Sequence, residues 1–161
     1  MAVYHHIPDE KLLKEFPELS LTESHIMVLY SLGMAASTIA SLQNKSPKTV
    51  NNHLANIKMK LSTDSIFDLR TVFNIRILLK ALKDRSKYGQ RLFPQLSIEQ
   101  EEILLSFTSG VSEREIAFGK KISENEINSV LTAVAITLDA DHATLRTVVC
   151  MKLTEHLLNT L

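Results

Sequence analysis

The chain contains very few of the residues that build disulfide frameworks, metal clusters or turn-rich folds. Of its 161 residues, one is cysteine (Cys150), none is tryptophan, and glycine and proline occur four times each. A single cysteine cannot form an intramolecular disulfide and provides no cluster for structural zinc. The scarcity of Gly and Pro, together with abundant Leu, Ile, Lys, Glu and Ala, favours helices. We therefore expect an all-α protein.

The sequence also lacks the long apolar runs of membrane proteins. No window is apolar over the length of a membrane span. The N-terminal run MAVYHHIPDEKLL has no basic start followed by an apolar stretch, so we expect no signal peptide. With 45% hydrophobic and 22% charged residues, a packed core is favoured over disorder. These features predict a cytoplasmic protein with no membrane partner.

Catalytic and cofactor signatures are missing as well. The chain has no glycine-rich phosphate loop, no nucleophile set beside a general base, and no receiver-type phosphoacceptor pattern. His5 and His6 are adjacent but have no further ligands nearby, so they do not predict a metal site. We expect a protein that is not an enzyme and that binds no cofactor, metal or small-molecule ligand.

Charge is balanced over the whole chain but is unevenly distributed. The formal net charge is zero. From Gln43 to Arg91, however, 11 Lys or Arg residues stand against three Asp residues, a net charge of +8. Residues 92–161 carry five basic and ten acidic residues, a net charge of −5. A basic block of this kind is expected of a surface that binds nucleic-acid phosphates.

An internal repeat organises the chain. The run FPELSL at 16–21 recurs as FPQLSI at 93–98, an offset of 77 residues. The same offset aligns glycine, serine and apolar positions, namely Gly33 with Gly110, Ser46 with Ser123, Val50 with Ile127, Leu54 with Leu131, and Leu61 with Leu138. After the loss of one residue, LRTV at 69–72 aligns with LRTV at 145–148. This period is too long for a solenoid unit and predicts a duplicated small domain.

Each copy is predicted to form four helices. In the first copy, Thr22 caps one helix and Gly33 ends it in a left-handed conformation, while Ser46 caps another that has Pro47 at its first position. The predicted helices cover 22–32, 36–43, 47–61 and 64–83, then 98–109, 113–120, 124–138 and 142–159, with a short helix within 8–15 opened by Pro8 and Asp9. The predicted organisation is an extension (1–15), a first domain (16–83), a polar linker (84–92) containing Gly89, and a second domain (93–161).

One motif in the first copy carries a functional signal. It combines Leu21-Thr22-Glu23, Gly33 and Ile39-Ala40 with the run Ser46-x-x-Thr49-Val50-x-x-His53-x-x-x-Ile57-x-x-Lys60-Leu61. From about Leu19 to Val72 the chain resembles the LuxR/GerE-type helix-turn-helix domain of bacterial response and quorum-sensing regulators. Thr38 departs from the family, which usually has Glu there. The resemblance implies a transcription regulator that binds double-stranded DNA. Together with the internal repeat, it predicts two tandem helix-turn-helix domains, the second degenerate.

The helix at 47–61 has two distinct faces. Its apolar positions (50, 54, 57 and 61) are expected to pack inward, and the opposite face is predicted to meet base edges through Asn51, Asn52, Ala55 and Asn56. Asparagine suits adenine, and alanine suits a thymine methyl group. The residues predicted to contact or face the phosphate backbone are Lys45, Ser46, Lys48, Thr49, His53, Lys58 and Lys60. Two alternatives stay open: an ordinary solvated face, and a packing role for His53.

The second copy keeps the scaffold but changes the corresponding helix. Glu126, Val130 and Thr137 stand where the first copy has Thr49, His53 and Lys60, and Glu124 adds a second carboxylate. Carboxylates facing a polyanion repel it, so this helix is not expected to bind DNA. Apolar residues around 127–138, and in the helices 64–83 and 142–159, favour an interface with a second copy or a partner regulator. A dimer would place two recognition helices on palindromic half-sites.

Three functional hypotheses follow. The first is a sequence-specific DNA-binding transcription regulator that reads the major groove with the helix 47–61 as a dimer. The second is a protein-interaction module, such as an anti-activator or heterodimer partner, that does not itself read DNA. The third, a sigma-factor-like region, is weaker because the chain lacks a further promoter-binding region. The intact motif and the basic middle favour the first hypothesis, and the acidic second copy keeps the second open.

Overall fold

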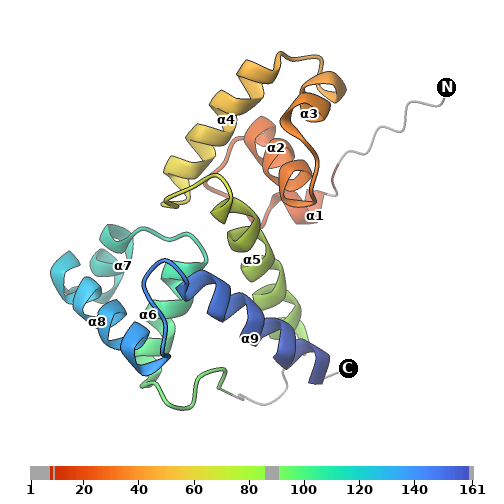
Figure 1. The fold of residues 1–161 in the computed structure, drawn as a ribbon. Coiled ribbons are helices and arrows are strands. Elements are labelled where there is room, and N and C mark those ends of the chain that lie inside the picture. Colours follow the sequence, from red (N-terminus) through yellow and green to blue (C-terminus); the bar gives the residue numbers. More distant parts are fainter. Residues whose placement is uncertain (1–7, 9, 86–90, 160–161) are drawn as a thin grey trace. The chain divides into compact units, whose positions relative to one another are not determined.

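A computed structural model describes residue 8, residues 10–85 and residues 91–159 of the chain. Every regular element within these residues is an α-helix, which confirms the predicted all-α class (Figure 1). No helix in this part of the chain is long and apolar enough to cross a membrane. His5, His6, Asp9 and Gly89, on which some predictions fall, lie outside the described residues.

The chain forms two compact units, Met1–Phe73 and Asn74–Leu161, which we call unit 1 and unit 2. The division falls inside one helix, α5 (Asp68–Arg85), so this helix contributes residues to both units. The linker expected at 84–92 begins at the end of α5 and lies partly outside the described residues. The domain boundaries stay a prediction.

Unit 1 contains α1 (Glu10–Leu13), α2 (Leu21–Ser31), α3 (Ala36–Leu42), α4 (Pro47–Lys60) and the first part of α5. Helix α4 packs on both α2 and α3, as Figure 1 shows. The largest fully buried side chains come from every one of these segments except α1, and include Phe16, Ile26, Met27, Ile39, Leu54, Ile57, Leu61 and Leu69. The helix-turn-helix pair α3 and α4 therefore rests on a shared apolar core.

The start of α2 differs from the prediction. Ser20, not Thr22, is the N-cap: its hydroxyl accepts a hydrogen bond from the backbone N–H of Glu23, and the Glu23 carboxylate accepts one from the Ser20 N–H. This reciprocal capping box satisfies two donors that the helix leaves open. The predicted end of the helix is confirmed, because Gly33 has φ +102°, a conformation that glycine adopts at little cost.

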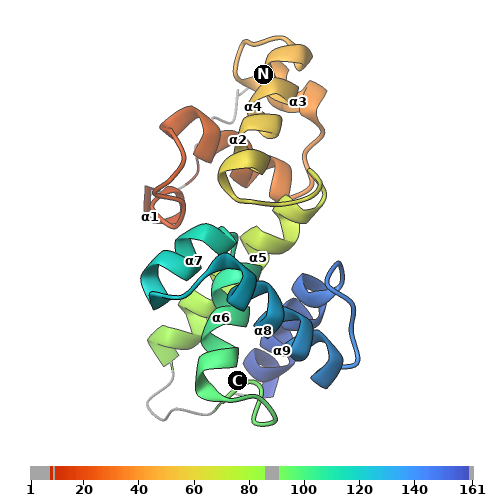
Figure 2. The same ribbon diagram turned by 90° about the vertical axis from the view of Figure 1, so that its left-hand side faces the viewer.

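Unit 2 contains the second part of α5, α6 (Ile98–Thr108), α7 (Glu113–Lys120), α8 (Glu124–Thr137) and α9 (Leu145–Asn159), arranged as Figure 2 shows. One apolar cluster joins these helices, with Ile75 and Leu82 of α5 among its buried members. On α5, Arg76 also donates a hydrogen bond from Nε to the Ser109 carbonyl at 2.7 Å, just after α6 ends.

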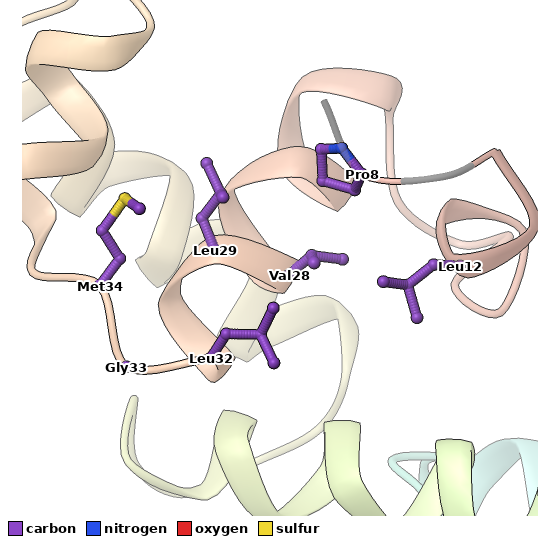
Figure 3. A pocket seen from close by; sticks show the side chains of 7 residues that line it. All are labelled: Pro8, Leu12, Val28, Leu29, Leu32, Gly33 and Met34. Carbon is purple, nitrogen blue, oxygen red and sulfur yellow. The ribbon is translucent and has the colours of Figure 1, made fainter. Parts of the chain in front are cut away.

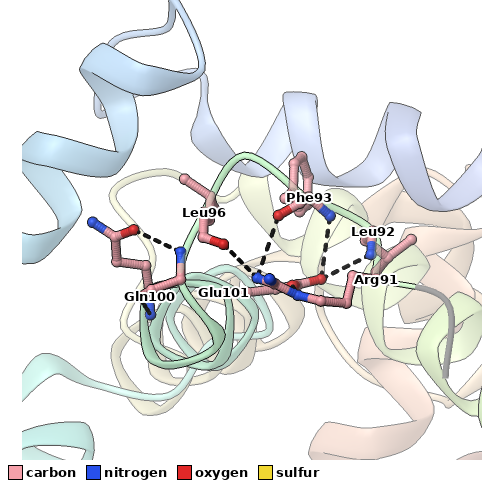
Figure 4. Close-up of polar contacts among 7 residues, drawn as sticks. Arg91, Leu92, Phe93, Leu96, Gln100 and Glu101 are labelled. Carbon is pink, nitrogen blue, oxygen red and sulfur yellow. Dashed lines mark hydrogen bonds and ion pairs between the residues drawn. The ribbon is translucent and has the colours of Figure 1, made fainter.

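A buried carboxylate fixes the entry of the chain into α6. Glu101 accepts hydrogen bonds from the backbone N–H groups of Leu92 (2.9 Å) and Phe93 (3.3 Å) and from Nε of Arg91 (2.9 Å) (Figure 4). The Arg91 guanidinium also donates to the carbonyls of Leu96 and Phe93. These hydrogen bonds tie the segment before α6 to the helix that follows it.

Matched conformations recur in the two units at the offset found in the sequence. Positive φ angles occur at Gly33 and Gly110, Asn44 and Lys121, and Ser62 and Asp139. An arginine of the last helix lies over an aromatic ring in each unit, Arg70 over Tyr30 at 4.6 Å and Arg146 over Phe107 at 4.7 Å. These correspondences support the duplication, which stays a prediction.

The last helix of each unit begins later than predicted, α5 at Asp68 and α9 at Leu145. Polar side chains close the preceding turn in both cases. Asp68 and Ser65 exchange side-chain-to-backbone hydrogen bonds at 3.0 and 3.2 Å, and Asp141 and Thr144 do the same at 2.8 and 3.2 Å. Such local bonds compete with helix formation, which explains why the residues before Asp68 and before Leu145 stay outside the two helices.

Candidate nucleic-acid interface

The start of α4 is built as the sequence predicts. Ser46 is its N-cap and accepts a hydrogen bond from the Thr49 N–H at 3.1 Å, and Pro47 opens the helix. The Ser46 and Thr49 hydroxyl groups also share a hydrogen bond of 2.8 Å. These residues leave no carboxylate in the first turn of α4, so the positive end of the helix dipole faces solvent without a local acidic group.

The two faces of α4 are divided as predicted. Val50, Leu54, Ile57 and Leu61 are all buried, which confirms the inward stripe. The four residues predicted to meet base edges, Asn51, Asn52, Ala55 and Asn56, are all exposed. A helix with a fixed inner face and a polar, small outer face has the form that enters the major groove. Exposure brings these residues together on one surface but does not test their contact with DNA.

Met59 is a member of this outer surface that sequence reasoning missed. Its side chain is 75% exposed. Met59 follows Asn52 by seven residues and Ala55 by four, spacings that place all three on one face of a helix. The signal was present in the sequence, because an apolar residue four after Ala55 cannot also lie on the stripe formed by Val50, Leu54 and Ile57.

The residues predicted to meet the backbone lie in different environments. Lys45 and Lys48 are exposed near the start of α4, whereas Thr49, His53 and Lys58 are partly buried along its flanks. The lysines at 45 and 48 therefore carry their charge at the end where the helix dipole is also positive. The part-buried position of His53 suits both a contact with a phosphate and a packing role.

Lys60 occupies a distinct position at the last residue of α4. Its ammonium group forms an ion pair with the Glu23 carboxylate, with 2.7 Å between Nζ and Oε2. The Glu23 side chain is 7% exposed and the Lys60 side chain 43% exposed. Sequence reasoning did not find this pair, because its members are 37 residues apart and lie on different helices.

In unit 2, helix α8 has the same length as α4 and a different surface. Glu124 and Glu126 are exposed in its first turn. Glu126 accepts hydrogen bonds from the backbone N–H and hydroxyl groups of Ser123, both at 2.8 Å, and these hold its pKa below the ordinary value. The Glu126 carboxylate therefore bears its charge at neutral pH, at the position where α4 has Thr49.

The apolar character of the helix at 124–138 is mostly core. Of the apolar residues between 127 and 138, four are buried (Ile127, Leu131, Val134 and Ala135), two are partly buried (Val130 and Leu138), and only Ala133 and Ile136 are exposed. The buried apolar residues of α5 likewise belong to cores, some to the core of unit 1 and others to the core of unit 2. Much of the apolar character of both helices therefore belongs to cores, which leaves a smaller apolar surface for a partner, and the interface stays a prediction.

An apolar pocket lies beside α2 (Figure 3). It has a volume of about 610 Å³ and is lined by Pro8, Leu12, Val28, Leu29, Leu32, Gly33 and Met34. None of the residues predicted to contact DNA lines it. Its side chains provide no polar group to orient a small molecule. Among the described residues, no group of three or more His, Cys, Asp or Glu side chains is placed to hold a metal ion.

Comparison with known proteins found a family match in the first half of the chain. Residues 17–73, which contain α2, α3 and α4, match the family described as bacterial regulatory proteins, luxR family. Protein TraJ of Escherichia coli is 30% identical over 93 residues, which make up 58% of this chain and 56% of that protein. The match thus spans little more than half of that relative. No solved structure matches the chain.

Proposed function

We propose that the chain is a sequence-specific DNA-binding transcription regulator whose helix α4 reads the major groove. The observation that carries this proposal is the outer face of α4, where Asn51, Asn52, Ala55 and Asn56 are exposed opposite a fully buried stripe. The luxR-family match over 17–73 supports the same function.

The chemistry of this face suits base recognition. An asparagine side chain offers a donor and an acceptor in the geometry that adenine presents in the major groove, and Ala55 allows close approach to a thymine methyl group. Lys45 and Lys48 add positive charge beside this face, where phosphates flank the groove. Base contacts would set the preferred sequence, and the lysines would set the register and most of the affinity.

We assign unit 2 to assembly rather than to DNA binding. Glu124 and Glu126 would face phosphates if α8 entered a groove as α4 does, and their charge would repel the backbone. A dimer formed through unit 2, or through α5 and α9, would present two α4 helices to a palindromic site. If sedimentation shows a monomer at micromolar concentration that retains tight, sequence-specific DNA binding, dimer formation is not needed and this part of the proposal fails.

The central experiment selects bound sequences from a pool of random duplexes. The full chain should enrich a defined sequence. Asn51→Ala or Asn52→Ala should each lose preference at particular base pairs, at a cost of about 1–3 kcal/mol. The matched control is Asn128→Ala, which changes the exposed asparagine of α8 at the position aligned with Asn51 and should leave the preference intact.

The same experiment tests the second candidate function, a protein-interaction module that does not itself read DNA. The exposed carboxylates at the start of α8 are the observation that favours it. If the chain enriches no sequence and the Asn51 and Asn52 variants bind random DNA as the unaltered chain does, the reading role assigned to α4 is wrong.

A further inference from the structure

The ion pair between Glu23 and Lys60 joins the two ends of the helix-turn-helix domain. Glu23 lies in the first turn of α2, and Lys60 is the last residue of α4. The carboxylate Oε2 of Glu23 accepts one hydrogen bond from the Lys60 ammonium (2.7 Å) and one from the Ser20 N–H (2.8 Å). An ammonium group has three N–H donors, and the Lys60 side chain is 43% exposed, so this cation also reaches solvent.

The capping role of Glu23 does not require a charge. In unit 2 the matching residue is Gln100, and it completes the same capping box by accepting a hydrogen bond from the Ser97 N–H at 2.9 Å. The residue of unit 2 that matches Lys60 is Thr137. The carboxylate and the ammonium are thus both present in the unit with the proposed DNA-binding helix, and both absent from the other.

Burying a charged carboxylate is unfavourable unless hydrogen bonds or a nearby cation compensate for the lost hydration. The whole of Glu23 is only 5% exposed. Burial raises the pKa of its carboxyl group, but the hydrogen bonds from Lys60 and Ser20 outweigh this, so that the pKa lies below its ordinary value. Glu23 is therefore charged at neutral pH and needs a cation beside it.

We propose that Glu23 is a positioning residue of the DNA-binding surface, which holds the Lys60 ammonium in place at the end of α4 so that it meets a DNA phosphate. This inference rests on the proposed function of α4. A free lysine side chain is flexible and must be ordered when it binds. A lysine that is already held loses less entropy on binding, so its phosphate contact is stronger.

If Glu23 positions Lys60, the Glu23→Gln substitution should have the opposite effect on DNA affinity from the one expected if only its charge matters. Glu23→Gln keeps the capping box, as Gln100 does in unit 2, and removes a negative charge near the proposed DNA surface. If charge alone matters, DNA binding becomes tighter, because a carboxylate no longer repels the phosphates. If Glu23 positions Lys60, binding becomes weaker although a repulsive charge has gone.

The test measures the affinity of the full chain for a random-sequence duplex over a range of salt concentrations. Such a duplex is suitable because phosphate contacts do not depend on base sequence. We expect Lys60→Met to lower the slope of log affinity against log salt by about one. Glu23→Gln should weaken binding several-fold, and the double variant should bind no more weakly than Lys60→Met alone. Asp64→Asn is the charge-matched control, because Asp64 is exposed just after α4, and this change should not weaken binding.

Three results would overturn the inference. They are tighter binding by Glu23→Gln, an unchanged salt slope in Lys60→Met, and an equal effect of Glu23→Gln with and without Lys60. The last result would mean that Glu23 acts on the fold alone. Circular dichroism at the assay temperature keeps only folded variants in the comparison. Failure of the unaltered chain to bind any duplex would instead refute the proposed function, so the two failures are distinguishable.

Discussion

Helices α4 and α8 are built on the same plan and present different surfaces. Each has 14 residues, a serine N-cap, and buried apolar residues at matching positions, such as Leu54 and Leu131. The outer face of α4 carries asparagines and is flanked by lysines, whereas α8 begins with two glutamates. Residues that hold a helix in its unit are thus separable from residues on its outer surface. The buried set is apolar in both helices, whereas the exposed set differs in charge.

The largest expected effect is on stability, and it tests whether α4 and α8 are buried in their units in the same way. Leu54→Ala and Leu131→Ala each remove a fully buried side chain, so each should lower the free energy of unfolding by about 2–5 kcal/mol. Denaturant unfolding of the full chain measures both. A loss below about 1 kcal/mol at one site would show that the two helices are not equally embedded in their cores.

The next effect tests the difference in charge. Lys48 is exposed on α4, and the aligned residue on α8 is Asn125. Lys48→Asn should lower the slope of log affinity against log salt by about one. The loss of affinity between about 50 and 200 mM salt should then be roughly threefold smaller in the variant than in the unaltered chain. The reciprocal Asn125→Lys should add nothing, because glutamates flank it. A gain in affinity from Asn125→Lys would mean that α8 also approaches DNA.

The caps offer an effect that depends on pH in one unit only. Ser46→Ala and Ser123→Ala should each cost about 1 kcal/mol at pH 7. Because hydrogen bonds from Ser123 lower the pKa of Glu126, their contribution is complete above the ordinary pKa of a glutamate and is lost as pH falls through the lowered value. The cost of Ser123→Ala should therefore shrink in acid, whereas Ser46 pairs with Thr49, which does not titrate.

Denaturant midpoints of the unaltered chain and of both cap variants, measured from pH 7 down to about pH 3, check this difference. A Ser46→Ala cost that shrinks as much as the Ser123→Ala cost would show that the acid effect does not come from Glu126.

The smallest effect concerns two exposed apolar residues at matching positions. Met59 and Ile136 are each 75% exposed, so replacing either by alanine should change the free energy of unfolding by less than about 0.5 kcal/mol. Met59→Ala should weaken binding to the selected duplex by about 1 kcal/mol or less, the scale of one buried CH₂ group. Ile136→Ala should leave binding unchanged, and an equal effect of both would remove Met59 from the proposed surface.

Local signals predicted most of the fold. The caps at Ser46 and Pro47, the turn at Gly33 and the inward stripe of α4 are all present where residue type and spacing placed them. The start of α2 was misplaced because Ser20 and Thr22 are both good caps. The choice of Ser20 follows from the glutamate three residues later, which completes its capping box.

Contacts between residues far apart in the sequence could not be predicted from it. Nothing in the pattern around Lys60 indicates that its partner is Glu23, because the pair forms only after α2 and α4 have packed. The apolar residues of α8 posed a similar problem. A sequence shows that Leu131 and Ile136 are both apolar, but only packing determines that one is buried and the other exposed. Contact with DNA by the residues of the outer face stays a prediction.

Because α5 contributes residues to both units, it has a practical consequence for the design of protein fragments. The border between the compact units falls after Phe73, but a fragment that ends there keeps less than two turns of α5. So short a helix is not stable in water, although Leu69, Val72 and Phe73 on it close the core of unit 1. A fragment intended to bind DNA by itself should therefore extend to Arg85, and proteolysis within α5 should disrupt both halves together.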